Sequence, residues 1–256
     1  MTEFIGRMPT AKAPKCGKDA ALTKAFALQR KRAAKALAAN CVVLPVVKGI
    51  FDMAKGILFV VSAPAGCGKD TILEKALAKD INLCYSVSAT TRAMRPGETE
   101  GISYYFKSRE EFEKMIAGGE LLEHTEYCGN YYGTPKETVE ETLESGKNVV
   151  LKIEIEGAGN VKKLIPEAVL IFILPPSMEE LSRRLHKRGT EDEETILKRL
   201  KQAETEISHA ENYDYVIVNG DLDEAVSDFV SVIKAEGFRV NRNKDLILNL
   251  RENKSE

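Results

Sequence analysis

The residues of this chain best suited to chemistry lie in the run 60–71, where a glycine-containing loop ends in Gly68 and Lys69. The apolar run 57–61 before it has the length of a buried strand, and residues 71–77 after it have helical spacing. The backbone N–H groups of such a loop, the N-terminus of the following helix and a lysine all favour bound phosphate. The string alone leaves two interpretations, an ordinary strand-to-helix turn and a phosphate-binding loop. The flanking strand and helix favour the second.

The loop departs at two positions from the usual motif Gly-x-x-x-x-Gly-Lys-[Ser/Thr]. Ala63 stands at the first glycine, and Asp70 stands where the motif has a hydroxyl that binds magnesium. A carboxylate is a good oxygen donor for Mg²⁺, but it also repels incoming phosphates. Asp70 is therefore the open question of this loop.

The composition limits the class of protein. With 256 residues and 43% hydrophobic content, the chain can bury a substantial core, so one domain with insertions or a tail is expected. No apolar stretch is long enough to span a membrane. The five cysteines are scattered and never form Cys-x-x-Cys, which argues against a disulfide framework or a zinc site and favours a cytoplasmic location.

The two ends of the chain differ from its middle. Residues 1–52 hold ten of the 37 Lys/Arg and three of the 39 Asp/Glu, whereas the remainder holds 27 and 36. This basic segment has three interpretations: an organelle-targeting segment, an arm for nucleic acid or a membrane surface, or a dispensable extension. We favour the last, because Met53 directly precedes the first strand and reads like a natural start. Residues 239–256 are expected to be a polar tail that frays.

Apolar runs alternate with helical segments along the middle of the chain. Long strands are expected at residues 83–87, 148–155, 168–174 and 215–218, with helices between them. This alternation predicts an α/β fold, a parallel sheet with helices on both faces. Shorter strands between residues 100 and 133 break the rhythm and predict a separate lobe.

Two local patterns predict where helices begin around that lobe. Ser108 and Glu111 form a capping box. Thr134, Pro135 and Glu137 have the order of an N-cap, a proline at the first helical position and a glutamate at the third.

From Gly56 to Glu236 the chain resembles the guanylate kinase family, which phosphorylates GMP with ATP. The resemblance rests on several short stretches beyond the phosphate loop: 86–92, 104–106, Glu123, 129–134, 175–177, 188–190 and 218–219. It implies a P-loop nucleoside monophosphate kinase fold for residues 53–238. The implied parts are a core (55–87, 136–187 and 200–238), a GMP-binding lobe (88–135) and a lid (188–199).

The resemblance also implies how GMP is bound. Guanine offers an N1–H and an exocyclic amine side by side, and one carboxylate can accept both, which is the implied role of Glu123. Hydroxyls near the base, guanidinium groups and phenols for the phosphate complete the set. The implied GMP-binding residues are Ser88, Arg92, Arg95, Tyr104, Glu123, Tyr132, Gly133 and Thr134. The capping pattern offers a competing, purely structural explanation for Thr134.

The implied ATP-binding and catalytic residues surround the transferred phosphoryl group, where positioning and positive charge matter most. ATP is implied to lie against the loop and a strand-end asparagine: Ala63, Pro64, Ala65, Gly66, Cys67, Gly68, Lys69, Asp70, Thr71 and Asn219. The implied catalytic cations are Lys69, Arg95, Arg184, Arg188 and Arg199. Arg183 has no such counterpart and is expected to be a surface residue.

The chain departs from the family in a second place, where the usual Leu-Asp-Ile-Asp is replaced by Leu151, Lys152, Ile153 and Glu154. We interpret Asp70 and Lys152 as a charge exchange in which the two side chains pair, with Asp70 as a ligand of Mg²⁺. The alternative is that Lys152 points to solvent and Thr71 supplies the missing hydroxyl.

The sequence therefore predicts an enzyme that converts ATP and GMP to ADP and GDP with Mg²⁺. Its expected partners are ATP and GMP, with no nucleic acid, membrane or evident protein partner. Two other functions remain open: a catalytically silent protein-binding module, and a kinase for another nucleoside monophosphate. The retained glycines, Lys69 and lid arginines argue against the first, and Glu123 argues against the second.

Overall fold

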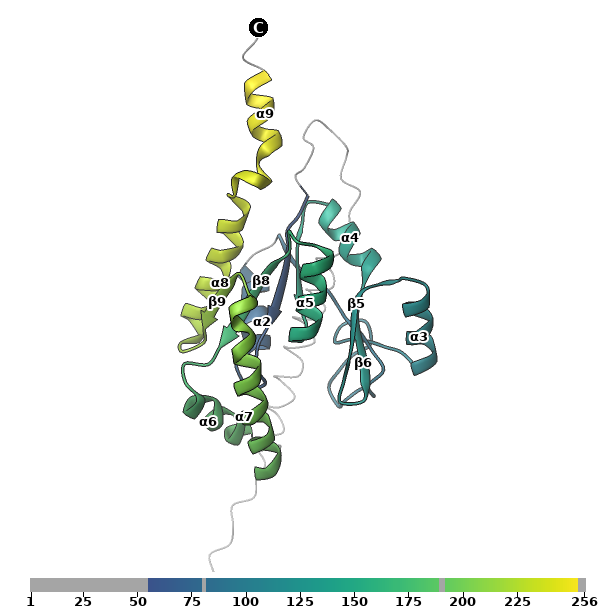
Figure 1. The fold of residues 1–256 in the computed structure, drawn as a ribbon, viewed down its shortest axis with the longest axis vertical. Helices are drawn as coiled ribbons and strands as arrows, with labels where there is room; N and C mark the ends of the chain where they lie inside the picture. Colours follow the sequence, from purple (N-terminus) through teal and green to yellow (C-terminus); the bar gives the residue numbers. More distant parts are fainter. Residues whose placement is uncertain (1–54, 80–81, 189–191, 253–256) are drawn as a thin grey trace, which may run out of the picture.

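The computed structural model describes residues 55–79, 82–188 and 192–252, which form two β-sheets and the helices around them (Figure 1). The basic extension 1–52, predicted to be dispensable, lies outside the described residues.

Among these residues, the larger sheet has five parallel strands in the order β2-β7-β1-β8-β9. They are β1 (Leu58–Ser62), β2 (Leu83–Tyr85), β7 (Asn148–Lys152), β8 (Val169–Leu174) and β9 (Tyr215–Val218). All residues of the central strand β1 are buried, as expected for a strand covered on both faces. The predicted parallel sheet is confirmed.

Helices cover both faces of this sheet. Phe59 and Val61 of β1 face a core shared with α2 (Lys69–Lys79), α6 (Met178–Arg188), α7 (Glu193–Ser208) and α8 (Leu222–Gly237). Leu58 and Val60 face the opposite core, shared with α4 (Lys136–Glu144) and α5 (Ile155–Leu164). Each fully buried large apolar side chain contributes about 1.5–3 kcal/mol relative to exposure. The two cores hold the carboxyl ends of the strands, and the loops beyond them, in fixed positions.

The smaller sheet forms a lobe beside the core, on the right of Figure 1. Its strands follow the order β4 (Tyr105–Phe106), β3 (Ala89–Thr90), β6 (Asn130–Pro135) and β5 (Leu121–Tyr127). Helix α3 (Arg109–Ala117) packs on it through Phe112, which is fully buried and stacks on Tyr131 at 5.3 Å between ring centroids. The capping box of Ser108 and Glu111 at the start of α3 is confirmed.

The predicted strand 148–155 is too long at its carboxyl end. Strand β7 ends at Lys152, and Glu154 is already the N-cap of α5. The alternation of apolar and charged residues continues past the strand, so the sequence shows no break there. The shorter strand places the Lys152 side chain at the carboxyl edge of the sheet.

The expectation of a frayed tail for residues 239–256 is wrong for the described part of that segment. A 3₁₀ turn η2 (Val240–Arg242) leads into α9 (Lys244–Glu252), which extends beyond α8 (Figure 1). The turn is held by Glu236, which is fully buried and accepts hydrogen bonds from Tyr215 at 2.6 Å and Arg242 at 3.2 Å. Four large apolar residues of α9 are exposed: Leu246, Ile247, Leu248 and Leu250. No helix within the described ranges is long and apolar enough to cross a membrane.

Candidate functional site

The loop after β1 folds as a phosphate-binding loop requires. Gly66 and Gly68 have φ angles of 96° and 84°, in the region that favours glycine. Helix α2 begins directly at Lys69, and the N–H of Ile72 donates to the carbonyl of Gly68 at 3.1 Å. A Cβ atom at Gly66 would lie 3.0 Å from the side chains of both Leu181 and Leu185. The loop is therefore held from outside by α6.

Asn219, at the end of β9, braces this loop. Its side-chain amide donates to the carbonyl of Cys67 at 2.6 Å, and a Cβ atom at Gly68 would clash with the same amide nitrogen. Its main-chain carbonyl accepts a hydrogen bond from Arg184 at 2.9 Å. The amide of Asn219 is thus directed at the loop backbone, a structural role that the resemblance did not imply.

Lys69 lies among charges of both signs. Burial lowers the pKa of its ammonium group; of the surrounding charges, Glu154 raises that pKa and Lys152 lowers it. Glu154 is exposed at the start of α5, which lies beside β1 and the loop that β1 feeds. The ammonium group therefore stands at the carboxyl edge of the sheet, where α2 and α5 both begin.

A buried carboxylate dominates the lobe side of the site. Glu123 on β5 is 7% exposed, and its Oε1 accepts a hydrogen bond from the Thr134 hydroxyl at 2.7 Å. Burial raises the pKa of Glu123 to about 7, and the bond from Thr134 opposes that rise. Gly157, in the first turn of α5, lies so close that a Cβ atom there would be 2.7 Å from the other carboxylate oxygen. The Glu123 carboxylate of the lobe, a hydrogen-bond acceptor, therefore lies against the first turn of α5.

The expected N-cap at Thr134 is wrong. Thr134 lies in β6 and is fully buried, and the N-cap of α4 is Pro135, which has no side-chain cap. The hydroxyl bonds to Glu123 instead of the helix backbone, because the antiparallel pairing places these two residues opposite each other. The competing structural explanation for Thr134 therefore does not hold.

A second cluster in the lobe collects cationic and phenolic groups. The guanidinium carbon of Arg92 lies 5.4 Å from the ring centroid of Tyr104, and the rings of Tyr104 and Tyr132 meet edge to face at 6.1 Å. Glu98 holds Arg92 by an ion pair of 2.7 Å and accepts from the backbone N–H of Arg95 at 2.7 Å. Arg95 itself is exposed. This set has the donors that a phosphate group requires.

The remaining predicted lobe residues support these two clusters. Ser88 is buried at 6% exposure, and its carbonyl accepts from the N–H of Tyr105 at 2.9 Å. Gly133 is buried in β6, where a Cβ atom would come within 2.9 Å of Phe112.

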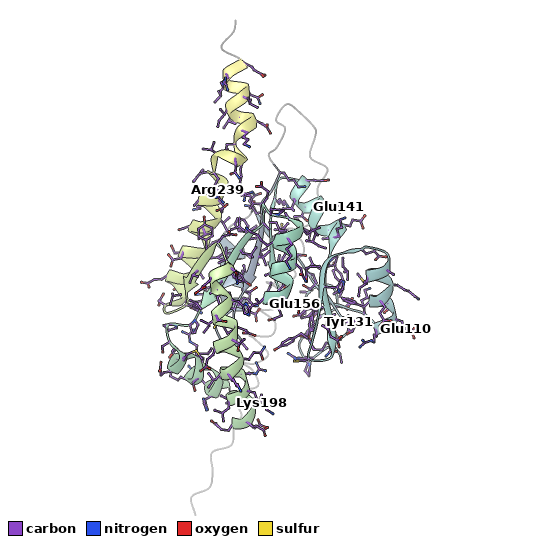
Figure 2. All side chains as sticks on the ribbon, in the orientation of Figure 1. Glu110, Tyr131, Glu141, Glu156, Lys198 and Arg239 are labelled. Atoms are coloured by element: carbon purple, nitrogen blue, oxygen red, sulfur yellow. The ribbon has the colours of Figure 1, made fainter. Side chains whose placement is uncertain are left out.

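A groove of ≈ 880 Å³ opens between α5 and α7 beside the site. It is lined by Glu154 and Glu206, among others, and one end is bridged by a 3.3 Å hydrogen bond from Gln202 on α7 to Tyr127 on β5. In Figure 2, Glu156 of α5 lies near the centre, with Tyr131 of the lobe to its right and Lys198 of α7 below it. The lobe and α7 therefore flank the start of α5 from two sides.

Comparison with known proteins identifies the family to which the chain belongs. The family model "Guanylate kinase" matches residues 55–236. The chain belongs to the guanylate kinase family. The guanylate kinases of Desulfitobacterium hafniense and Caldanaerobacter subterraneus subsp. tengcongensis are each 52% identical to it. The first alignment covers 73% of this chain and 94% of the relative, the second 77% and 96%. A solved guanylate kinase from Anaplasma phagocytophilum is 40% identical, with a TM-score of 0.61, over 74% of this chain and 90% of that one.

The lid arginines expected from the guanylate kinase family lie on two helices. Arg184 on α6 is half-buried and bonds to Glu180 at 2.7 Å as well as to the Asn219 carbonyl. Arg199 is half-buried on α7. Arg188 is the last residue of α6, and its side chain lies outside what the structure describes. Arg183 is exposed, as predicted, and also pairs with Glu180, whose pKa these two arginines lower to about 2.

Asp70 and Lys152 meet, as the charge-exchange interpretation predicts. The Lys152 ammonium donates to Asp70 Oδ1 at 2.8 Å, which excludes the alternative that Lys152 points only to solvent. Thr71 follows Asp70 in the first turn of α2 and is exposed.

Three residues that matter for this site were missed. Glu98 and Glu180 hold the guanidinium groups of Arg92 and Arg184, and Gly157 makes room for Glu123. Only Glu180 had a readable signal, since it stands four residues before Arg184 on one helix. Glu154 was noted only as a departure from the family, and its place near Lys69 follows from the start of α5.

Proposed function

We infer that this chain is a nucleoside monophosphate kinase that transfers the γ-phosphoryl group of ATP to GMP, giving ADP and GDP. Membership of the guanylate kinase family supports this activity. The observation that carries the choice of GMP is the buried Glu123 carboxylate of the lobe, which accepts a hydrogen bond from Thr134.

In this proposal Glu123 accepts the N1–H and the exocyclic amine of guanine, with Thr134 and Ser88 beside the base and Gly133 giving close access. Two adjacent donors favour the ionised carboxylate, whose pKa of about 7 keeps it half ionised near neutral pH without ligand. Arg92, Arg95, Tyr104 and Tyr132 bind the GMP phosphate.

ATP lies along the loop Ala63–Thr71, with its outer phosphates near Lys69. An oxygen of the GMP phosphate then forms the new P–O bond to the γ-phosphorus while the bond to the β-phosphate oxygen breaks. Lys69, Arg95, Arg184, Arg188 and Arg199 stabilise the charge on the moving group.

The residues present fit a magnesium ion that enters with the nucleotide. The described residues hold no cluster of three or more side chains suited to a resident metal. Mg²⁺ in such sites is typically held by one or two protein ligands plus substrate phosphates, and Asp70 offers one exposed carboxylate at the start of α2. When bound, the ion would neutralise charge on the phosphates. We place this reaction in the cytoplasm, in line with the scattered cysteines.

The test is a coupled ADP-release assay with GMP, AMP, UMP and IMP as acceptors. We expect GMP to be preferred, and IMP, which lacks the exocyclic amine, to lose on the order of 10²-fold or more in kcat/KM. If none of the four acceptors gives ADP release, a silent binding module remains as the function. Preference for AMP or UMP would assign a different nucleoside monophosphate and remove Glu123 from base selection.

A further inference from the structure

An ion pair joins the end of β7 to the first turn of α2. The Lys152 ammonium donates to Asp70 Oδ1 at 2.8 Å. The two partners are unequally covered, since the Lys152 side chain is 24% exposed and the Asp70 side chain 70%. The lysine belongs to the body of the protein, and the carboxylate stands at the surface where the phosphate-binding loop ends.

The register of the sheet explains why Lys152 reaches this point. Lys152 pairs with Val61, the residue one position before the end of β1. Both strands are parallel, so their carboxyl ends meet at one edge, and the loop leaving β1 passes directly beside Lys152. The position of this lysine is therefore set by the central sheet and not by a flexible loop.

The charge of Lys152 also acts on tyrosines outside the loop, one of which, Tyr104, is assigned to the GMP phosphate. Its ammonium lies 5.6 Å from the ring centroid of Tyr85, at the end of β2. Burial raises the pKa of Tyr104, and the charge of Lys152 opposes that rise, so the two groups interact. The charge of Lys152 also lowers the pKa of Lys69. This charge thus acts both on the phosphate-binding loop, through Asp70, and on Tyr104 of the cluster assigned to the GMP phosphate.

The carboxylate of Asp70 poses an electrostatic problem that this lysine can solve. A negative charge in the first turn of α2 is favoured by the helix dipole, yet it repels the phosphates of ATP, which must approach the same helix end. An opposite charge at 2.8 Å cancels most of the field that Asp70 exerts on a ligand several ångströms away.

We propose that Lys152 is a positioning residue for ATP: it neutralises Asp70 at the mouth of the phosphate-binding loop and holds that carboxylate where it can face the Mg²⁺ of the nucleotide. This inference rests on the proposed function. It predicts that Lys152 matters most when no metal is present, because bound Mg²⁺ supplies positive charge of its own next to Asp70.

The experiment measures ATP binding to the full chain by calorimetry, without GMP, in EDTA and again in saturating Mg²⁺. The variants are Lys152→Met, Asp70→Asn and the double variant. The control is Lys75→Met, because Lys75 also pairs with an aspartate in the first turn of a helix, Asp223, at 2.7 Å. Melting temperatures confirm that each variant is folded.

We expect Lys152→Met to weaken metal-free ATP binding roughly tenfold or more, the effect of one uncompensated charge near the phosphates. The loss should be clearly smaller in Mg²⁺. Asp70→Asn should tighten metal-free binding and reduce the gain from Mg²⁺, and the double variant should return metal-free binding close to the wild-type value. Lys75→Met should change neither.

Equal losses for Lys152→Met with and without metal would overturn the proposal. So would a double variant whose metal-free ATP binding stays as weak as that of Lys152→Met. If Lys152→Met does not fold, Asp70→Asn tests the same charge from an exposed position. The proposed function is judged separately, by GMP phosphorylation with the wild-type protein. A chain that binds ATP as described but does not phosphorylate GMP would refute the function and leave the charge pair standing.

Discussion

Replacing Glu123 with glutamine should stabilise the protein while removing its choice of base. The carboxyl group is 7% exposed, and its pKa rises from 4.5 to about 7 in the fold. Each pKa unit corresponds to about 1.36 kcal/mol, so keeping Glu123 ionised in the folded protein costs about 3 kcal/mol. The amide has no charge to desolvate, and its oxygen can still accept from Thr134.

The sign of the pH dependence follows from proton binding. Between pH 4.5 and 7 the folded protein holds a proton on Glu123 that the unfolded chain has released, so stability falls as pH rises through this window. Between pH 5 and pH 8 the wild type should lose about 2–3 kcal/mol of unfolding free energy relative to Glu123→Gln. Any pH-independent effect of the substitution cancels in this difference.

The assay is urea unfolding of both proteins at several pH values, with GMP affinity measured in parallel. Glu126→Gln is the matched control, because Glu126 is an exposed glutamate of the same strand. The reasoning is refuted if the stability difference between Glu123→Gln and wild type is the same at pH 5 and pH 8. The role of Glu123 in binding guanine is refuted if the stabilised variant still binds GMP with unchanged affinity.

Four further outcomes are expected. Gly157→Ala should weaken GMP binding by on the order of ten- to hundredfold and leave ATP affinity unchanged, because its methyl group meets the Glu123 carboxylate; calorimetry with each nucleotide decides. Glu236→Ala should lower the unfolding free energy by about 3–5 kcal/mol, since it removes the buried partner of an arginine, while kcat at low temperature is retained. Arg199→Ala should lower kcat far more than GMP affinity, and equal losses in both would assign it to ground-state binding. A chain starting at Met53 should keep the melting temperature and activity of the full chain, and a loss of either would show that the basic extension serves the domain.

The sequence best predicted those elements whose structure depends on residues close together in the chain. The buried strand β1, the glycine loop and the start of α2 follow one another along the chain, so their local pattern was sufficient. The contact between Asp70 and Lys152 was also predictable, although 82 positions separate them. Parallel strands bring their carboxyl ends to one edge, and this rule needs only the strand assignments.

Predictions failed where a local pattern and a distant partner compete for the same residue. Thr134 has the spacing of an N-cap, but its hydroxyl faces Glu123 across the antiparallel pair, and the buried carboxylate takes the bond. The described part of the tail failed for the same reason, because Glu236 and Tyr215 fix the turn before α9 from outside the segment. Packing partners of this kind have no signature in the segment that they order.

The contact between α6 and the phosphate-binding loop limits how this protein can vary. Gly66 is confined twice, by a φ angle of 96° and by the side chains of Leu181 and Leu185, each 3.0 Å from the place of a Cβ atom. Smaller residues at 181 and 185 would relieve the crowding but not the backbone strain. No single compensating substitution therefore opens position 66 to another residue. Substitutions on the hydrophobic face of α6 must instead keep the space around a fixed glycine, so α6 and the phosphate-binding loop are expected to change together.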